Sequence, residues 1–428
     1  MAKISNTLKD FKELVNGIKN IDVFYSSLQT NDQKFREFIS IFDSVEDSRM
    51  INKCKYTVST IVGIVFMGIL SNMDTWIEIE AFARKKKEVV GKYVDLSNGI
   101  PSHDTLVRVF GLIKSETLED ALVTFIQDSI KKVISFLNDE NSFDLLTIDG
   151  KSQNGSGRSN TQNGAVRNTQ TLNLYNPATG VTIKSKLIEE KTNEIPVAQA
   201  ILRTINVKGV IISTDAMNCQ KETVKVIKEE KAHYVLGLKG NHGGFHNEIE
   251  EAFNQPFKKT STNYYEMEVE KNHNQVEKRE YYMINANKLL YADEWEGINN
   301  VVMAKKITTN NFTGEEKEER RYYISDLKDV ELISEAIRRH WAIENELHWH
   351  LDVTLNEDEN TTMNKRAVHN LSIMKKNILT MLKLLQPLFG KVSLKTTRKL
   401  FALNYEENIM KLFSLLDSQN IEELIKNK

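Results

Sequence analysis

The sequence predicts an α/β protein in which a strand-rich core follows a helical region and is interrupted by a second, β-rich segment. Residues up to about 140 show the apolar period of helices, and from residue 141 the period changes to that of strands. Strands and helices then alternate until residues 256–326, which contain only strand-like runs separated by polar turns. At 428 residues, with 40% hydrophobic and 27% charged side chains, the chain is long enough for two or three globular domains.

The composition argues against a membrane-spanning protein and against a secreted, disulfide-rich one. The longest apolar run, residues 58–70, is too short to cross a bilayer, and no charged lead followed by an apolar stretch marks an export signal. Cys54 and Cys219 are too few for a disulfide framework or a cysteine metal site. We therefore expect a cytoplasmic protein.

The net charge of the chain is −2, whereas many nucleic-acid-binding proteins carry an excess of basic residues. Basic runs, such as residues 84–87, occur locally.

The first 140 residues contain apolar or amphipathic helical runs at 35–42, 56–70 and 76–87. A turn at residues 98–102 then ends in Ser102, a favourable helix cap, and the helix that follows turns His103 and Arg108 away from its apolar face. This pattern is compatible with a helix-turn-helix DNA reader, in which His103 and Arg108 would contact DNA. A plain helical bundle accounts for the same pattern.

The core contains five strand candidates, at residues 143–148, 169–175, 181–189, 210–214 and 233–238. The second and third are joined by residues 176–180, Asn-Pro-Ala-Thr-Gly, which favour a hairpin turn. A helix is predicted after each of the last three strands, starting near residues 193, 218 and 242. Three meandering strands followed by alternating helices and strands is the order of the ribonuclease-H-like (retroviral-integrase-like) fold. In that fold the first and fourth strands lie side by side.

The remaining segments complete the predicted organisation. After the β-rich insertion at residues 256–326, a long helix carries Glu344, and an apolar helix runs from about residue 367 to Gln386-Pro387. We therefore predict an all-helical N-terminal domain at 1–140, a catalytic domain at 141–386 that contains the insertion, and a basic, then amphipathic, tail at 387–428.

Three carboxylates stand where this fold would bring them together. Asp149 and Asp215 each end an apolar strand-type run. Glu344 lies in the segment 338–349, which is rich in acidic, histidine and tryptophan side chains. Mg²⁺ prefers carboxylate oxygens, and phosphodiester cleavage and strand transfer use two such ions, one at the attacking oxygen and one at the leaving oxygen. The sequence thus predicts two Mg²⁺ ions, replaceable by Mn²⁺, held by Asp149, Asp215 and Glu344.

The helix around Glu344 allows two other interpretations. Four side chains follow one another at four-residue spacing and would form one stripe: His340, Glu344, His348 and Asp352. Zinc accepts such ligands, although the His-Glu-x-x-His spacing of metalloproteases is missing. The simplest alternative is an ordinary polar helix face with Trp341 and Trp349 packed into the core; otherwise Trp349 is a candidate for base stacking.

Several short phrases occur in order along the chain: Pro101-Ser102-His103-Asp104-Thr105, Ile148-Asp149-Gly150-Lys151, Glu190-Lys191-Thr192-Asn193-Glu194-Ile195-Pro196, Thr214-Asp215-Ala216, Tyr234-Val235-Leu236-Gly237-Leu238-Lys239-Gly240-Asn241, His340-Trp341-Ala342-Ile343-Glu344-Asn345, Leu347-His348-Trp349 and Leu351-Asp352-Val353. With these phrases, from about residue 30 to about 400, the chain resembles the insertion-sequence DDE transposases of the branch that includes the H-repeat-associated proteins.

The resemblance implies that Asp149, Asp215 and Glu344 are the catalytic, metal-binding triad of a DNA transposase. It also implies double-stranded DNA partners, namely the terminal inverted repeats of the element and the target DNA, and a location at the nucleoid. A homodimer on DNA is expected, because two element ends must be brought together. Candidate DNA contacts near the triad are Lys151, Lys239, His340, Asn345, His348 and Trp349.

The chain departs from the family pattern at four places. His340 and Leu351 stand where related transposases often carry an arginine and a lysine, so the DNA contacts of those two family residues are not carried over. The family phrase His-Gly-Arg-x-Glu-x-Arg appears at residues 273–279 without its glycine and first arginine. Glu359-Asn360 follows Asp358 in place of the usual arginine.

We therefore predict a transposase that binds the inverted repeats, cleaves the element ends with water and joins the 3′ hydroxyl to target DNA. Two alternatives stay open: a DNA-binding transposase remnant without catalysis, and a metal-dependent DNA nuclease without strand transfer.

Overall fold

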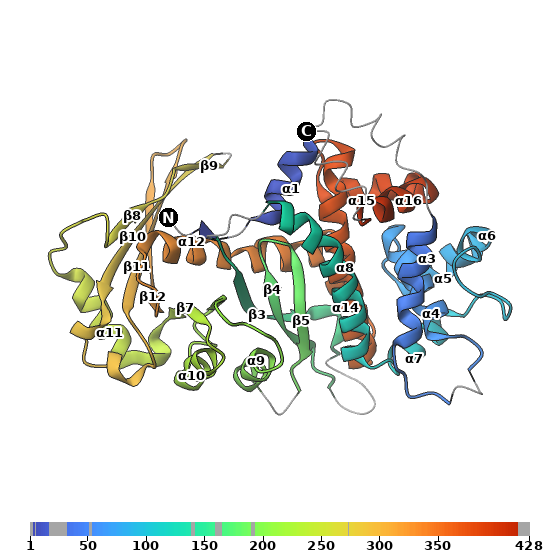
Figure 1. Cartoon of the computed structure of the whole chain (residues 1–428), viewed down its shortest axis with the longest axis horizontal. Coiled ribbons are helices and arrows are strands. Elements are labelled where there is room, and N and C mark those ends of the chain that lie inside the picture. The colour runs from blue at the N-terminus through green and yellow to red at the C-terminus, as the bar shows by residue number, and fades with distance from the viewer. Residues whose placement is uncertain are drawn as a thin grey trace.

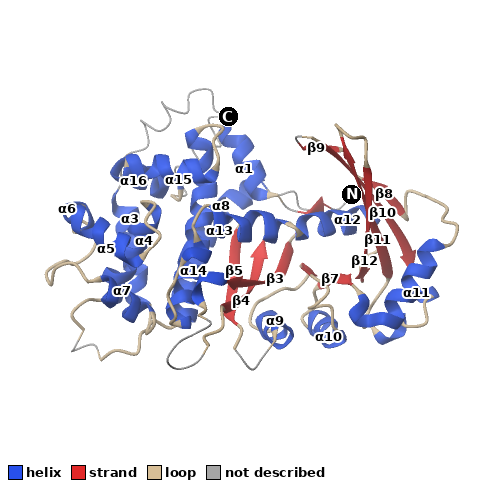
Figure 2. Ribbon diagram, turned by 180° about the vertical axis from the view of Figure 1, so that it is seen from behind, coloured by secondary structure: helices blue, strands red, loops and turns tan. Residues whose placement is uncertain are grey.

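A ten-stranded mixed sheet runs through one half of the molecule, and a helical region forms the other half (Figures 1 and 2). The computed structural model describes residues 3–4, 6–16, 32–50, 54–137, 142–158, 165–189, 193–272 and 274–417. Within these ranges, no helix is both long and apolar enough to cross a membrane.

The strands of the sheet follow the order β5–β4–β3–β6–β7–β12–β11–β10–β8, with β9 beside one end of β10. Their bounds are β3 Leu145–Gln153, β4 Thr169–Asn176, β5 Val181–Leu187, β6 Ile211–Thr214, β7 His233–Leu238, β8 Tyr264–Glu266, β9 Glu270–Asn272, β10 Gln275–Asn285, β11 Asn300–Asn310 and β12 Glu316–Ser325. β3 is antiparallel to β4 and parallel to β6. The predicted adjacency of the first and fourth core strands is therefore confirmed. A separate two-stranded sheet pairs β1 (Lys3–Ile4) with β2 (Ser142–Phe143).

Helices cover both faces of the core strands (Figure 1). On one face, α9 (Glu194–Leu202) and α10 (Lys221–Glu229) share an apolar core with residues such as Ile148 and Ile212, while α11 (Gly243–Asn254) packs beside the insertion, with Phe253 against Tyr322 of β12. On the other face, α12 (Val330–His340) packs against Leu145, Ile211 and Val235. Because successive side chains of a strand point to opposite faces, Leu145 and Ile148 serve different cores.

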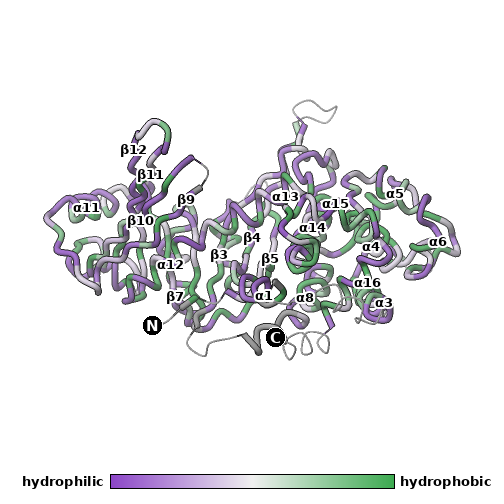
Figure 3. Tube along the Cα trace, turned by 90° about the horizontal axis from the view of Figure 1, so that it is seen from above, coloured by the Kyte–Doolittle hydropathy of each residue, from purple (hydrophilic) through white to green (hydrophobic). Residues whose placement is uncertain are grey.

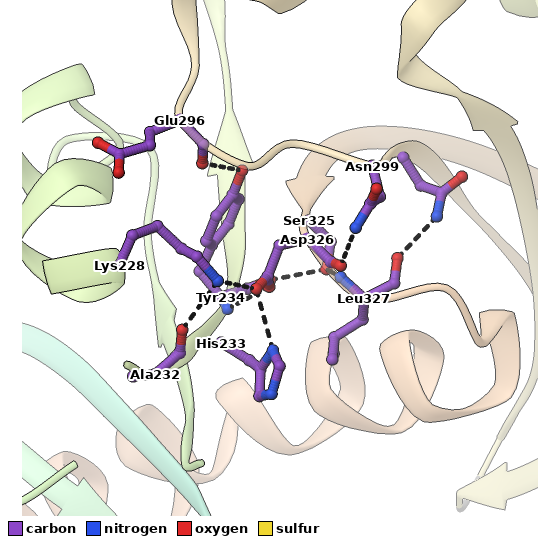
Figure 4. Close-up of polar contacts among 10 residues, drawn as sticks. Lys228, Ala232, His233, Tyr234, Glu296, Asn299, Ser325, Asp326 and Leu327 are labelled. Carbon is purple, nitrogen blue, oxygen red and sulfur yellow. Dashed lines mark hydrogen bonds and ion pairs between the residues drawn. The ribbon is translucent and has the colours of Figure 1, made fainter. Parts of the chain in front are cut away.

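The β-rich insertion continues the core sheet. β12 is antiparallel to β7, with Tyr322 opposite Leu238, so the insertion strands β8–β12 and the core strands share one hydrogen-bonded surface. Where β12 ends, the buried Asp326 carboxylate accepts hydrogen bonds from the Tyr234 amide (2.8 Å) and the Lys228 ammonium (2.6 Å), and it contacts Nδ1 of His233 (2.9 Å; Figure 4). These bonds fix the insertion to β7 and to α10.

The helical region draws on both ends of the chain. Its members are α1 Thr7–Asn16, α3 Asp32–Ser40, α4 Val58–Leu70, α5 Trp76–Lys85, α6 Lys87–Val90, α7 His103–Phe110, α8 Ser115–Leu137, α14 Lys365–Leu385, α15 Leu394–Leu403 and α16 Tyr405–Leu415. One apolar core joins residues 8–126 to residues 343–416. The apolar run predicted near residues 58–70 is α4, whose first turn is capped by the Thr57 hydroxyl and which is almost wholly buried. Residues 394–415, expected as part of a tail, form α15 and α16 in this core.

Candidate active site

Asp149 and Asp215 lie at neighbouring positions of adjacent parallel strands. Ile148 of β3 is paired with Thr214 of β6, and each aspartate is the next residue along its chain. Parallel pairing sends both chains in the same direction, so the two carboxylates emerge at the same place in the sheet. This is how the fold joins two residues that are far apart in sequence.

Glu344 reaches the same place from the segment that follows α12. The helix ends at His340, and Ile343–His348 forms a π-helical turn before α13 (Trp349–Val353). A π-turn inserts extra chain into a helix and changes which side chains share a face. The four predicted stripe residues nevertheless face the same edge of the sheet: His340 and Glu344 line one cavity with Asp149 and Asp215, His348 faces Asp149, and Asp352 binds Lys151, two residues further along β3. Among the described residues, no three acidic, histidine or cysteine side chains form a group ready to hold one ion.

The neighbouring acids raise the pKa of Asp149. Burial, followed by the negative charge of Asp215, raises the pKa of Asp149 to about 7, and Glu194 and Glu344 act in the same direction. The amide of Gly150 donates to Asp149 Oδ1 at 2.9 Å and partly offsets the shift. Carboxylates that repel one another in a partly buried site suit a divalent cation, because its charge removes the repulsion and its preferred ligands are oxygens. The chemistry of this donor set therefore fits Mg²⁺.

Glu194 is a fourth acid at the site. It belongs to one of the family motifs in the sequence, but the sequence predicts no role for it. It is the first residue of α9, and its carboxylate lies against Gly150: a Cβ on Gly150 would meet Glu194 Oε1 at 2.2 Å. The Asn218 amide bridges the acids, with Nδ2 3.2 Å from Asp215 Oδ1 and 3.4 Å from Glu194 Oε2. The Asp149-Gly150 dipeptide could have indicated this contact from the sequence, because glycine has no side chain and lets another group come close to the backbone.

A cavity of about 510 Å³ opens beside the acids. Its lining includes Asp149, Asp215 and Glu344 together with Lys239, His246, Arg320, Arg321, His340 and Trp341. The predicted DNA contacts Lys239 and His340 thus lie beside the acids, but only Lys239 is exposed. His340 is 9% exposed and burial lowers its pKa to about 4, so the ring is neutral at physiological pH. The guanidinium of Arg321 stacks on Trp341, 4.1 Å from the ring centre.

A second cavity, of about 380 Å³, adjoins the first across Glu344, Trp341 and Arg321. It is lined by Asn345, another predicted DNA contact, and by five cations that come mostly from the insertion strands: Arg279, Lys305, Lys306, Arg321 and Arg338. Each of these five cations forms an ion pair with a glutamate, as in the Arg338–Glu270 pair at 3.1 Å. Residues 277 and 279, retained from the family phrase, pair with each other in this cavity wall.

Lys151 and His348 lie close to the acids but are buried. Both carboxylate oxygens of Asp352 accept from the Lys151 ammonium at 2.7 Å, and Lys151 is 8% exposed. The Lys151 ammonium is thus bound to Asp352 in this structure, whereas the sequence predicts a contact with a DNA phosphate. Nδ1 of His348 lies 3.6 Å from Asp149 Oδ2, and burial lowers the pKa of the ring to about 3.

The other predicted DNA contacts lie away from these two cavities. Trp349 is 53% exposed and is packed edge-on against His350. His103, at the start of α7, bonds to Glu80 of α5 through both its amide and Nδ1 (2.7 Å each), and Arg108 is exposed on α7. The structure thus brings Lys239, His340, Asn345, Lys151 and His348 to the acids, and leaves His103 and Arg108 in the helical region.

Comparison with known proteins identifies the family. Residues 142–382 match the model described as "Transposase DDE domain", and residues 39–126 match the model described as "DDE_Tnp_1-associated". The chain is 30% identical over 394 residues to "Putative transposase YncI" of Escherichia coli O157:H7, which covers 88% of this chain and 94% of that protein. It is 30% identical over 336 residues to "H repeat-associated putative transposase YhhI" of Escherichia coli K12, with 76% and 84% covered.

The chain is also similar to a solved structure, the "piggyBac transposase synaptic complex with hairpin DNA", with a TM-score of 0.39 and 12% sequence identity. The match covers 95% of this chain and 81% of that one. This similarity is too weak to support an argument about fold or function. The family models and the relatives agree over most of the chain. The protein therefore belongs to the insertion-sequence DDE transposases of the branch that includes the H-repeat-associated proteins.

Proposed function

We propose that the protein is an active DNA transposase that binds the terminal inverted repeats of its element, cleaves the DNA at their ends and joins the freed 3′ hydroxyl to target DNA. One observation carries the proposal: Asp149, Asp215 and Glu344, from three separate segments of the chain, line a single cavity. The core strand order β5–β4–β3–β6–β7 is the order of a ribonuclease-H-like nuclease core, which supports the same function.

In this proposal Asp149, Asp215 and Glu344 hold two Mg²⁺ ions. When bound, the ions supply an activated attacking oxygen and a stabilised leaving oxygen. Asp149 and Asp215 orient the site because they stand on paired strands, and Gly150 and Asn218 hold one oxygen of each by hydrogen bonds. Water is the nucleophile for cleavage, and the 3′ hydroxyl of DNA is the nucleophile for joining.

The DNA backbone would lie along the two adjoining cavities. Lys239 is exposed at the rim of the first cavity, and the insertion strands supply cations such as Arg321 and Lys306 to the second. Phosphate contacts of this kind position a duplex without reading its sequence. We assign reading of the repeats to the helical domain at 1–140, the chemistry to residues 141–386, and the active form to a homodimer on DNA at the nucleoid.

The exchange Asp215→Asn tests the proposal, because it removes a carboxylate but retains size and shape. We expect no detectable Mg²⁺-dependent cleavage of a plasmid carrying the inverted repeats that flank the gene, and nearly unchanged affinity for those repeats in a mobility-shift experiment. Asp293 is exposed and lines neither cavity, so Asp293→Asn is the matched control and should cleave like the wild type.

Three outcomes distinguish the alternatives. Cleavage by Asp215→Asn at the wild-type rate would show that the acids do not carry the chemistry. Tight binding of the repeats by the wild type without cleavage in Mg²⁺ or Mn²⁺ would indicate an inactive remnant. Cleavage without joined products, when precut ends and supercoiled target DNA are both supplied, would indicate a nuclease.

A further inference from the structure

His348 is enclosed between the catalytic edge of the sheet and a buried polar network. The side chain is 9% exposed, with Nδ1 3.6 Å from Asp149 Oδ2 and Nε2 3.3 Å from Nδ2 of Asn173. Asn173 lies on β4, opposite Asp149 of β3, and is fully buried. The imidazole therefore links a proposed metal ligand to the interior of the protein and cannot reach DNA without unpacking.

The orientation of the Asn173 amide follows from its other partners. The Lys376 ammonium, from α14, lies 2.6 Å from Asn173 Oδ1, and the Ser185 hydroxyl lies 2.9 Å from the same atom. An ammonium group can only donate hydrogen bonds, so the atom that it contacts must be the carbonyl oxygen of the amide. The Asn173 NH₂ group consequently faces His348.

This orientation fixes the protonation pattern of His348. An amide NH₂ is a donor, so the nitrogen that it faces, Nε2, must be an acceptor and carries no proton. The doubly protonated ring is excluded for the same reason, because two donors would face each other. The single ring proton is then on Nδ1, which points to Asp149. At 3.6 Å this contact is longer than a normal hydrogen bond, and such contacts often shorten only in the reacting complex.

We propose that His348 is a positioning residue for Asp149: Lys376 orients Asn173, Asn173 holds His348 in its Nδ1–H form, and this N–H directs the Asp149 carboxylate. The inference rests on the proposed function in that Asp149 is taken to bind the metal. Gly150 donates to Oδ1 at 2.9 Å and Nδ1 of His348 faces Oδ2 at 3.6 Å, so the two oxygens of Asp149 face different donors. Partners of this kind orient a metal-binding carboxylate and tune its affinity.

The protonation pattern is measurable without metal, DNA or activity. Long-range ¹⁵N–¹H correlation spectra of the full-length protein labelled with ¹⁵N-histidine distinguish the two neutral forms and the cation, and the His348 signal is assigned by its loss in His348→Asn. At neutral pH we expect the Nδ1–H form. Observation of the Nε2–H form, or of the doubly protonated ring, overturns the proposal.

Two variants test the consequence for Asp149. His348→Phe keeps the ring without a donor, and we expect the Mg²⁺ concentration for half-maximal cleavage to rise about 10- to 100-fold. His348→Asn places an amide donor near the position of Nδ1 and should recover most of this loss. His350→Phe is the matched control, because this histidine bonds to Thr354 and should leave the Mg²⁺ requirement unchanged. Melting temperature and binding of the repeats show whether each variant folds.

The results separate this inference from the proposed function. A wild-type Mg²⁺ requirement in His348→Phe, or no recovery in His348→Asn, overturns the positioning role even where the wild type transposes. If the wild type does not cleave at all, the proposed function fails, and the ¹⁵N spectra still decide whether Asn173 fixes the form of His348.

Discussion

Charged groups on the two sides of the candidate active site differ in how deeply they are buried. Behind Asp149, toward α14, the charged groups are buried and bonded: Lys376 is 2% exposed and has two hydrogen-bond acceptors. On the other side, the insertion strands carry exposed ion pairs such as Arg320–Glu318, whose side chains are 43% and 40% exposed. By hydropathy, the β11–β12 hairpin is mostly hydrophilic, whereas much of α4 and α14 is hydrophobic (Figure 3). Buried charges hold a geometry, whereas exposed pairs can exchange an acid for a phosphate at little cost.

The largest effect should come from breaking a buried cation of the helical region. Arg398 is fully buried and donates to the carbonyls of Ile69 and Thr354 and to the Asp74 carboxylate at 2.7–3.0 Å. Arg398→Ala leaves these acceptors unsatisfied and should lower the free energy of unfolding by about 3–5 kcal/mol. Urea denaturation measures the change, and a loss below 1 kcal/mol would contradict the contrast drawn here.

A pH-dependent effect should follow from Glu119 on α8, which accepts from the Ser185 amide at 2.6 Å. Burial raises its pKa from 4.5 to about 7. Between these pH values the folded protein keeps a proton that the unfolded chain has lost, so stability falls as pH rises from about 4.5 to 7 and is constant above. The free energy of unfolding of the wild type minus that of Glu119→Gln should fall by up to about 3 kcal/mol over this window. A flat difference would show that Glu119 ionises normally in the folded protein.

The smallest effect on stability should come from the front of the site. Arg320→Ala breaks an exposed pair and should change the free energy of unfolding by less than about 1 kcal/mol, in contrast to Arg398→Ala. Its effect should appear in DNA binding, as a weaker affinity and a shallower dependence on salt concentration, because one phosphate contact is lost. Titrating labelled repeats at several salt concentrations checks this, and an unchanged salt slope would place the DNA elsewhere.

The sequence predicts the core well because its signals are local and periodic. The alternation of strands and helices indicates that β3 lies beside β6. This adjacency in turn predicts that Asp149 and Asp215 lie close together. The alternation does not indicate that β12 pairs with β7, because that pairing belongs to the insertion and not to the strand order of the predicted fold. Nor does it predict the π-turn at Ile343–His348, because the residue pattern there is that of an ordinary α-helix. Glu194 and Asn218 were missed as well, since their proximity to Asp215 exists only in the folded chain.

The single apolar core that joins residues 8–126 to residues 343–416 has a consequence for biosynthesis. The N-terminal helices leave the ribosome long before α14–α16, which complete their packing. At about 5–20 residues per second, the intervening segment takes on the order of tens of seconds to synthesise. During that interval the helices expose apolar surface that only the end of the same chain can cover. A nascent chain should therefore depend on chaperones, and it cannot complete the support behind Asp149 until its last helices have been made.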